Sequence, residues 1–231
     1  METLAIHKEE LPYTVKEELK GLRSNIMFCG DKVQSVLLTS CLDNEGKSTI
    51  SLELARSFAE LGKETLLLDT DLRNSVILDK IEAGTSRYGL THFLSGQCEA
   101  NDAIYSTTEK HFYVMPAGPI PPNPSELLAS PRFEKLMTAL KKTFEIVIID
   151  SAPLGMVVDA SAIAPFADGT VLVMESGKDD YRLAQDVIAR LKNANAKVFG
   201  VVMNKVDTKR AGYGYGYGYG YGYGYGKKYG K

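Results

Sequence analysis

A Gly-Lys-Ser triplet between an apolar segment and a helical pattern constrains the fold of this chain more than any other feature. Gly46, Lys47 and Ser48 follow the apolar residues 36–38, and apolar side chains recur at helical spacing from Ile50 onward. A strand, a tight loop and a helix in this order form the context in which such a triplet binds phosphate. The helix begins with unpaired backbone N–H groups and the positive end of its dipole, which both favour an anion in the loop. We therefore predict a nucleotide site in which Lys47 reaches the outer phosphates and Ser48 binds Mg²⁺.

The loop itself departs from the phosphate-binding pattern G-x-x-x-x-G-K-[ST], because Cys41 stands where the first glycine is expected. Asn44 tolerates left-handed backbone better than most other non-glycine residues. Asp43 and Glu45 bring negative charge near the expected phosphates, which weakens nucleotide binding unless both side chains point outward. The residues expected to contact nucleotide in this segment are Cys41, Leu42, Asp43, Asn44, Glu45, Gly46, Lys47, Ser48 and Thr49.

Two further apolar runs end in aspartate. Residues 66–68 are leucines followed by Asp69 and Asp71, and residues 146–149 are isoleucine or valine followed by Asp150. An apolar run that closes on charge is typical of a buried parallel strand whose carboxyl end faces a site. One such carboxylate can hold Mg²⁺ or its waters, and another can accept a hydroxyl proton. Three phosphate and metal signals on three predicted parallel strands therefore indicate one shared ATP–Mg²⁺ site.

The order of strands and helices predicts the fold class. Strand and helix patterns alternate up to residue 207, which favours an α/β fold of the P-loop NTPase type with a mostly parallel central sheet and helices on both faces. We expect residues 1–30 to form an N-terminal extension with an oligomerisation helix. Residues 31–207 form the predicted P-loop domain, and residues 208–231 a flexible tyrosine-rich tail.

Local signals place several element boundaries. We expect the first strand to span residues 32–40, and Gly62 to end the helix that follows the loop. Ser130 with Pro131 is typical of a helix start, and Asp159 is expected to cap a short helix. Residues 1–12 show no periodic pattern.

From Thr14 onward the spacing is helical. Val15 begins an apolar face, and Glu17, Lys20 and Arg23 share the polar side at intervals of three. This polar side is either a solvated helix face or a subunit contact, and the residues alone leave both readings open.

Composition excludes several classes. The chain has 231 residues, 44% of them hydrophobic, and a net charge of −2, so it can form one α/β domain and is not a strongly electrostatic nucleic-acid binder. Its three cysteines have neither disulfide nor metal spacing, which favours a reducing compartment. Met1 is followed by glutamate rather than a basic and then apolar run, so we expect no secretory signal. No apolar stretch approaches the ~20 residues that span a bilayer.

The composition changes abruptly after Asp207. Residues 212–226 alternate strictly between glycine and tyrosine, and lysines follow at 227, 228 and 231. Glycine at every second position raises the entropy cost of ordering the segment. Phenol hydroxyls tethered to an ATP–Mg²⁺ site are an effective local substrate.

These features together resemble the bacterial tyrosine kinases of capsule and exopolysaccharide synthesis, in the separate cytoplasmic kinase type. Residues 40–48 match an altered Walker A motif of that family, residues 66–73 its Walker A′ and residues 147–153 its Walker B. Residues 118–128 look like a further family signature, and a C-terminal tyrosine cluster completes the likeness. The resemblance covers nearly the whole chain.

The resemblance implies a role for each candidate residue. Lys47, Asp69 and Asp71 are the expected catalytic residues, with Asp69 as the base for the tyrosine hydroxyl. Ser48, Asp71 and Asp150 are the expected Mg²⁺ ligands, and Asn204 joins the loop in binding ATP. Arg73 is a weaker candidate for the site. The expected phosphoacceptors are Tyr213, Tyr215, Tyr217, Tyr219, Tyr221, Tyr223, Tyr225 and Tyr229.

The resemblance also implies partners. The family's ring-forming Glu-x-x-Arg-x-x-Arg helix appears here as Glu17, Lys20 and Arg23, and lysine in the middle position removes bidentate pairing, so we expect a weaker homo-oligomeric ring. A membrane-embedded activator and a phosphotyrosine phosphatase are the other expected partners, and no nucleic acid is expected. The chain would then act in the cytoplasm at the inner face of the membrane, through its activator.

Two other readings remain open at this stage. A deviant Walker A switch ATPase carries an extra lysine near the start of the loop, where this chain has Leu42, and has no need of a tyrosine tail. A chain whose altered loop has lost catalysis would instead be a regulatory scaffold.

Overall fold

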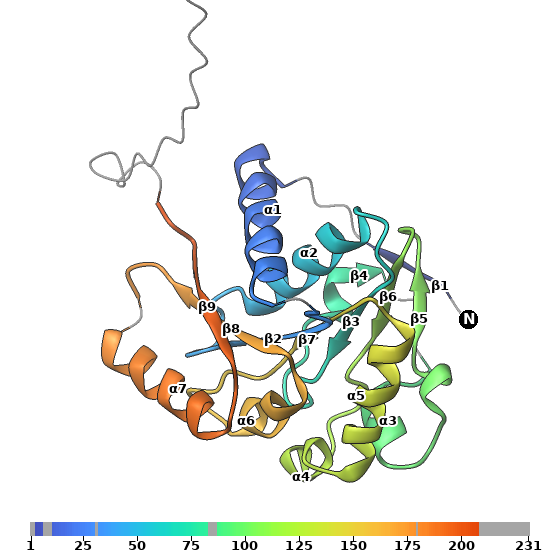
Figure 1. The fold of residues 1–231 in the computed structure, drawn as a ribbon. Helices are drawn as coiled ribbons and strands as arrows, with labels where there is room; N and C mark the ends of the chain where they lie inside the picture. Colours follow the sequence, from blue (N-terminus) through green and yellow to red (C-terminus); the bar gives the residue numbers. More distant parts are fainter. Residues whose placement is uncertain (1–2, 7–10, 31, 83–86, 179, 208–231) are drawn as a thin grey trace, which may run out of the picture.

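The computed structural model describes residues 3–6, 11–30, 32–82, 87–178 and 180–207, and the predicted tyrosine tail lies outside these ranges. Within them the chain forms a nine-stranded sheet in the order β4-β1-β5-β6-β3-β7-β2-β8-β9. The pairs β4–β1 and β5–β6 are antiparallel, and all the other neighbours run parallel. The prediction of an α/β fold with a mostly parallel sheet is confirmed, and helices cover both faces of this sheet (Figure 1).

The strands and helices occupy the following residues. The strands are β1 Thr3–Ile6, β2 Ser35–Ser40, β3 Thr65–Asp69, β4 Ile81–Glu82, β5 Tyr105–Thr107, β6 Phe112–Met115, β7 Ile146–Asp150, β8 Gly169–Glu175 and β9 Val198–Asn204. The helices are α1 Tyr13–Phe28, α2 Lys47–Ala59, α3 Leu90–Leu94, α4 Pro124–Leu128, α5 Pro131–Thr143, α6 Asp159–Ile163 and α7 Tyr181–Asn193, and a short 3₁₀ turn spans Leu78–Lys80.

The three central strands, β2, β3 and β7, are buried along their whole length. Their apolar runs suit this position, because a parallel sheet covered on both faces has no solvent side to require polar alternation. Asp69 pairs with Asp150 in register, and Leu38 of β2 pairs with Asp150 from the other side. The two aspartates that close the predicted strands therefore lie side by side at one edge of the sheet.

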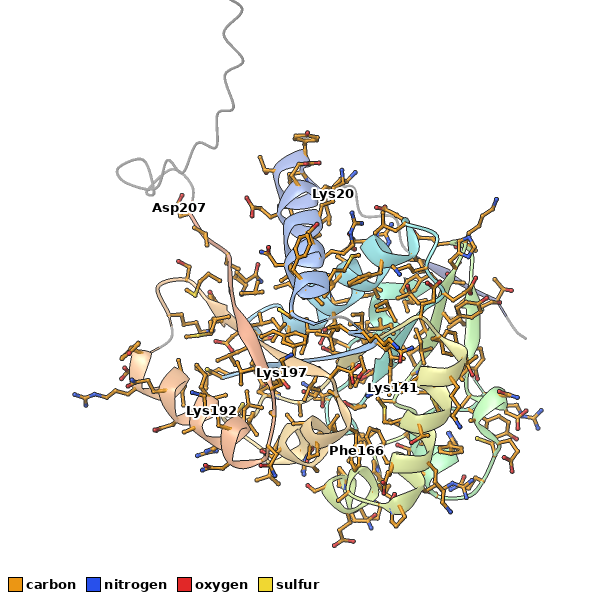
Figure 2. All side chains as sticks on the ribbon, viewed as in Figure 1. Lys20, Lys141, Phe166, Lys192, Lys197 and Asp207 are labelled. Atoms are coloured by element: carbon orange, nitrogen blue, oxygen red, sulfur yellow. The ribbon has the colours of Figure 1, made fainter. Side chains whose placement is uncertain are left out.

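Two apolar layers hold the helices against the sheet, and side chains fill both (Figure 2). On one face, Ile26 of α1 and Phe58 of α2 pack on the sheet. On the other face, α5 buries four apolar residues that recur at helical spacing, Phe133, Leu136, Met137 and Leu140. Burying such side chains contributes about 1.5–3 kcal/mol each to folding.

The helix-boundary predictions hold at two places and fail at a third. Ser130 Oγ accepts a hydrogen bond from the Phe133 amide at 3.3 Å, so it caps α5 as expected. Gly62 has a φ of +78°, and the helix before it ends at Ala59. Asp159 does not cap α6: it is the first residue of that helix, and its carboxylate binds Arg73 instead.

The N-terminal segment differs from the expectation of an unpatterned stretch. β1 pairs with β5 in parallel and with β4 in antiparallel orientation, so these residues extend the sheet. Four residues are too short for a periodic pattern to distinguish them from a loop. In α1, Val15 is 41% exposed and Ile26 is the one buried residue, so the predicted apolar face contacts the protein only toward its C-terminal end.

None of the helices in the described ranges is long and apolar enough to cross a bilayer.

Asp168 fixes the start of β2. Its carboxylate accepts hydrogen bonds of 2.8 Å from the backbone amides of Gln34 and Ser35 and from the Lys141 ammonium. Burial raises the pKa of this carboxyl, but Lys141 and the two amides outweigh burial, so the pKa lies below its ordinary value. The ionised carboxylate is thus the form that the fold prefers.

We predict that Asp168→Ala lowers the free energy of unfolding by about 2–3 kcal/mol at neutral pH, because two amides and an ammonium lose a charged partner. Asp168 contributes stability above its unfolded pKa of about 4, and this contribution disappears as the pH falls through the lower folded value. Urea unfolding at several pH values should therefore show the difference from the parent chain shrinking in acid. Asp186→Ala, at an exposed position of α7, is the control; a difference that stays constant with pH would contradict the assignment.

Candidate functional site

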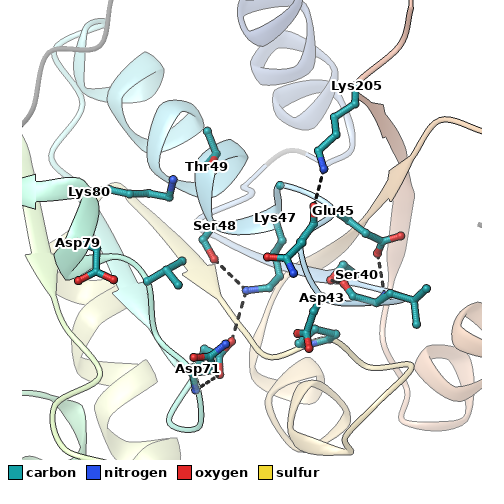
Figure 3. A pocket seen from close by; sticks show the side chains of 16 residues that line it. Ser40, Asp43, Glu45, Lys47, Ser48, Thr49, Asp71, Asp79, Lys80 and Lys205 are labelled. Atoms are coloured by element: carbon teal, nitrogen blue, oxygen red, sulfur yellow. Dashed lines mark hydrogen bonds and ion pairs between the residues drawn. The ribbon is translucent and has the colours of Figure 1, made fainter. Parts of the chain in front are cut away.

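A cavity of about 490 Å³ opens at the carboxyl edge of the sheet, where the three predicted motifs meet (Figure 3). The loop before α2 forms one wall, and the segment after β3 forms the other. The lining residues are Ser40, Leu42, Asp43, Asn44, Glu45, Gly46, Lys47, Ser48, Thr49, Asp71, Asn74, Val76, Asp79, Lys80, Pro153 and Lys205.

The start of α2 is built to receive an anion. Gly46 has a φ of +88°, and a Cβ there would lie 2.1 Å from Asn204 Nδ2, so only glycine fits this position. Among the described residues, no side chain caps the helix, which leaves the first amides of α2 without a side-chain acceptor. Backbone amides and the positive helix end at the cavity fit the phosphate group that the sequence predicts.

Lys47 links the loop to the acidic strand ends. Its side chain is 7% exposed, and Nζ lies 3.1 Å from both carboxylate oxygens of Asp150 and 3.1 Å from Ser48 Oγ. Asp71 Oδ2 is 3.8 Å away (Figure 3). Two nearly buried carboxylates are therefore balanced by one ammonium, as the cost of burying an unpaired charge requires.

The two aspartates after β3 occupy different positions. Asp71 lines the cavity, whereas Asp69 is fully buried behind it. Asp69 Oδ1 accepts the Asp71 amide at 3.1 Å, and Oδ2 accepts a hydrogen bond from the Ser75 hydroxyl. Each oxygen of the predicted base therefore accepts one hydrogen bond, and because Asp69 is fully buried, a phenol reaches it only after the segment around Ser75 moves.

Burial, and after it the nearby Asp150 charge, raise the pKa of Asp69 to about 7. The Ser75 hydroxyl, the Lys47 ammonium and the Asp71 amide oppose this rise. A carboxyl with a pKa near neutrality is suited to accept and release a proton at physiological pH.

Sequence reasoning missed a polar network beside the cavity. Arg73 Nε and Nη2 donate to Asp159 at 2.7 and 3.1 Å, and Nη2 also donates to Ser125 Oγ at 3.0 Å. Asp159 is fully buried and also accepts from the Ser125 hydroxyl. The network ties the segment after β3 to residues 118–128, which gives that signature a structural role. The sequence signal for this network is an aspartate at the start of a short helical pattern, which by itself indicates a cap.

The end of β9 anchors the phosphate loop. Asn204 Nδ2 donates to the Glu45 carbonyl at 2.8 Å, and Lys205 Nζ donates to the Asn44 carbonyl at 2.7 Å. Lys205 also pairs with Glu175 Oε2 at 3.0 Å. Asn44 has a φ of +64°, so the loop does adopt left-handed backbone where the sequence allows it.

The two acidic residues of the loop, Asp43 and Glu45, differ in exposure. Asp43 is exposed, whereas Glu45 is 1% exposed and its Oε2 accepts the Leu42 amide at 2.8 Å. The Glu45 carboxylate therefore braces the loop from within. Because it stays close to the cavity, its charge opposes phosphate binding.

Two predicted nucleotide contacts do not line the cavity. Cys41 packs in the apolar core beneath the loop, and Asn204 holds the loop from behind. Their predicted contact with nucleotide therefore has no direct counterpart in this geometry.

The predicted oligomerisation residues also differ in their contacts. Glu17 and Lys20 form an exposed ion pair of 2.8 Å on α1. Arg23 turns inward and donates to the carbonyl and the hydroxyl of Ser57 on α2, the latter at 2.9 Å. Arg23 is thus engaged within the chain, while the other two residues stay at the surface.

A metal at this cavity would have few protein ligands. In the described part of the chain, no group of three or more histidine, cysteine, aspartate or glutamate side chains is arranged to hold a metal ion. The oxygens present are the Ser48 hydroxyl and the carboxylates of Asp71 and Asp150. This donor set fits Mg²⁺, which takes one or two carboxylates and completes its shell with phosphate oxygens and water.

The raised pKa of Asp69 can be tested through the dependence of stability on pH. Its folded pKa is raised, so its stabilising contribution is complete below the unfolded pKa of about 4 and is lost as the pH rises through about 7. We predict that Asp69→Asn, which stays neutral, gains stability relative to the parent as the pH rises from about 4 to about 8. Denaturant unfolding at several pH values, without metal or nucleotide, measures this difference. If the free energy of unfolding changes equally with pH in the two proteins, the raised pKa is contradicted.

Lys205 yields a test of the loop anchor. We predict that Lys205→Ala raises the dissociation constant of an ATP analogue by about tenfold, because the loop loses one charge-assisted hydrogen bond. Lys178→Ala is the matched control, since Lys178 also pairs with Glu175, at 3.2 Å, but has no bond to the loop. Calorimetric titration of both variants measures the effect, and the anchor is disproved when they weaken binding equally.

Comparison with known proteins agrees with this geometry. The family model described as the CobQ/CobB/MinD/ParA nucleotide binding domain matches residues 39–213. The tyrosine-protein kinase CpsD of Streptococcus agalactiae is 39% identical over 199 residues, which cover 86% of this chain and 87% of the relative. The succinoglycan biosynthesis transport protein ExoP of Rhizobium meliloti is 35% identical over 80% of this chain, which spans only 24% of ExoP.

A solved structure extends the likeness to three dimensions. The chimerical protein CapA2B2 superposes with a TM-score of 0.81 at 34% identity, covering 89% of this chain and 94% of that one. The relative that this chain covers over 87% of its length is named a tyrosine-protein kinase, which disfavours the switch ATPase reading. The chain belongs to the bacterial tyrosine-protein kinases built on a P-loop nucleotide-binding domain of the CobQ/CobB/MinD/ParA type.

Proposed function

We propose that this chain is an autokinase that transfers the γ-phosphoryl group of ATP to tyrosines of the C-terminal tail of a neighbouring copy. The observation that carries the proposal is the position of Lys47, at the start of an uncapped helix and between two acidic strand ends. The chain supplies its own acceptors, because residues 212–226 alternate between glycine and tyrosine.

The first amides of α2 and the Lys47 ammonium bind the phosphates. Since Lys47 now pairs with Asp150, nucleotide binding requires its ammonium to exchange part of that contact for phosphate oxygens. Ser48, Asp71 and Asp150 would hold Mg²⁺, which when bound neutralises charge on the phosphates. Asn204 and Lys205 act through the loop, by keeping its carbonyls turned away from the phosphates.

In the transfer step, the tyrosine oxygen bonds to the γ-phosphorus while that phosphorus separates from the β–γ bridging oxygen, and ADP leaves. Asp69 accepts the phenol proton once Ser75 has released its carboxylate. The raised pKa of Asp69 supports this role, since a base near neutrality both takes and returns the proton. Positioning and charge neutralisation supply most of the rate, as in other phosphoryl transfers.

The chain acts beside a membrane-embedded activator at the inner face of the cell membrane, in polysaccharide synthesis and export. The likeness to ExoP supports this, because the chain matches 24% of that transport protein. The exposed Glu17–Lys20 pair on α1 supports a subunit contact at that helix. A phosphotyrosine phosphatase resets the tail.

We predict that the purified chain, incubated with ATP, Mg²⁺ and a cytoplasmic segment of an activator, gains phosphate on tyrosines between Tyr213 and Tyr229. Lys47→Met should remove this label, because the phosphates lose their cation and two acidic side chains lose theirs. Mass spectrometry of the tail measures the outcome. A Lys63→Met variant is the control, since Lys63 pairs with Glu145 on the surface and does not line the cavity.

The same samples separate the alternatives. Absence of label with ATP still bound would contradict the kinase proposal and favour a switch ATPase. Absence of both label and binding would mean that the altered loop has ended catalysis. Each phosphotyrosine adds about −1.5 to −2 charge, so labelled protein should sediment as smaller oligomers than unlabelled protein.

A further inference from the structure

An apolar groove lies at the opposite end of the sheet from β4, lined by residues of α7, β8 and the last strand, β9. Its volume is about 650 Å³, and it is separate from the nucleotide cavity. Its apolar lining includes Met174, Ile188, Val201 and Met203. Gln185 and Lys192 also line it and contribute polar groups.

The strand beside this groove has an open edge in the described part of the chain. The Asn204 carbonyl accepts the Ser176 amide at 2.9 Å, so Asn204 faces β8, as does Val202 two residues earlier. The alternation leaves the backbone groups of Val201 and Met203 directed outward. The side chains of these two residues are also 43% and 51% exposed.

An open edge of this kind can pair with an additional strand. Among the described residues, this seven-residue edge has exposed apolar side chains and outward-directed backbone groups, which make it a template for strand addition. The groove adds a place for the side chains of every second residue of the incoming strand.

We propose that the unphosphorylated Gly-Tyr tail of this chain docks here, as an added antiparallel strand on β9 with its tyrosines in the α7 groove. This docking requires no phosphoryl transfer, so it goes beyond the proposed function and stands without it.

The position of the tail supports this occupant. The described chain ends at Asp207, three residues after β9, at the strand's carboxyl end (Figure 2). Nine residues lie between Met203 and Tyr213. A hairpin loop needs about two to five residues, so the connection is about twice as long as a tight turn requires. The tail can therefore turn back along the strand from which it emerges.

The composition of the tail matches the groove. In an extended chain, residues two apart share a face, so residues 212–226 place every tyrosine on one face and only glycine on the other. The rings suit the sulfur atoms of Met174 and Met203, which make favourable contacts with aromatic side chains. The phenol hydroxyls can reach Gln185 and Lys192 at the border, as buried tyrosines require.

Amide hydrogen exchange of the full chain tests the docking, after mass spectrometry has shown that the tail carries no phosphate. The amides of Val201 and Met203 should exchange at least about tenfold more slowly than in a variant in which all eight tail tyrosines are serine. Leu172 in β8 is the internal control, because it pairs with β9 within the sheet and should be unaffected.

Two surface variants test the groove itself. Ala189→Arg blocks the groove at an exposed position of α7 and should abolish the protection. Asp186→Arg, exposed on the same helix but outside the groove, should preserve it.

Three results would overturn the proposal. The first is equal exchange at Val201 and Met203 with and without the tail tyrosines. The second is protection that survives Ala189→Arg, which would place the tail elsewhere. The third is protection that falls on about a hundredfold dilution, which would make a second copy of the chain the occupant.

Discussion

The site depends on the contact between the Lys47 ammonium and the Asp150 carboxylate. This contact joins the start of α2 to the end of β7, so the phosphate loop and the acidic edge are fixed relative to each other. Ser51 strengthens it by donating to Asp150 at 2.8 Å from the next turn of the helix. Removal of the ammonium would leave a nearly fully buried carboxylate without its cation, which is costly. The pair therefore matters for the fold as well as for the chemistry.

The parallel register of the sheet makes this contact possible. β3, β7 and β2 are neighbours, so the residues that close them meet at one edge. The loop that faces this edge lacks the first glycine of its pattern. Its shape is instead secured by the Glu45 carboxylate from within and by Asn204 and Lys205 from β9. The strand that anchors the loop is also the strand from which the tyrosine tail emerges, so the site and its proposed substrate share one element.

The convergence of the site was predictable from the sequence because it follows from backbone periodicity. Apolar runs that end at Asp69 and Asp150 place these residues at the carboxyl edge, whatever the remaining contacts are. The orientations of the side chains were not predictable in this way. Asp69 and Asp71 are two residues apart and share a direction in an extended strand, yet the chain turns after β3 and only Asp71 reaches the cavity.

Contacts between distant segments were the other gap. Arg73 meets Asp159 across 86 positions of sequence, and Lys205 meets Asn44 across 161. No local pattern encodes such pairs, because each depends on how two separate segments pack. The strand β1 was missed for a related reason, since four residues acquire strand structure only by pairing with β5.

The most direct test of the shared phosphate and metal site is a calorimetric titration of the full chain with a non-hydrolysable ATP analogue, with and without Mg²⁺, alongside Asp150→Asn. Binding that needs Mg²⁺ in the parent chain and loses that dependence in the variant is the predicted result, because Asp150 is assigned to both the Lys47 contact and the metal. Equal affinity for the analogue with and without Mg²⁺ in the parent chain would contradict a shared phosphate and metal site at this edge of the sheet.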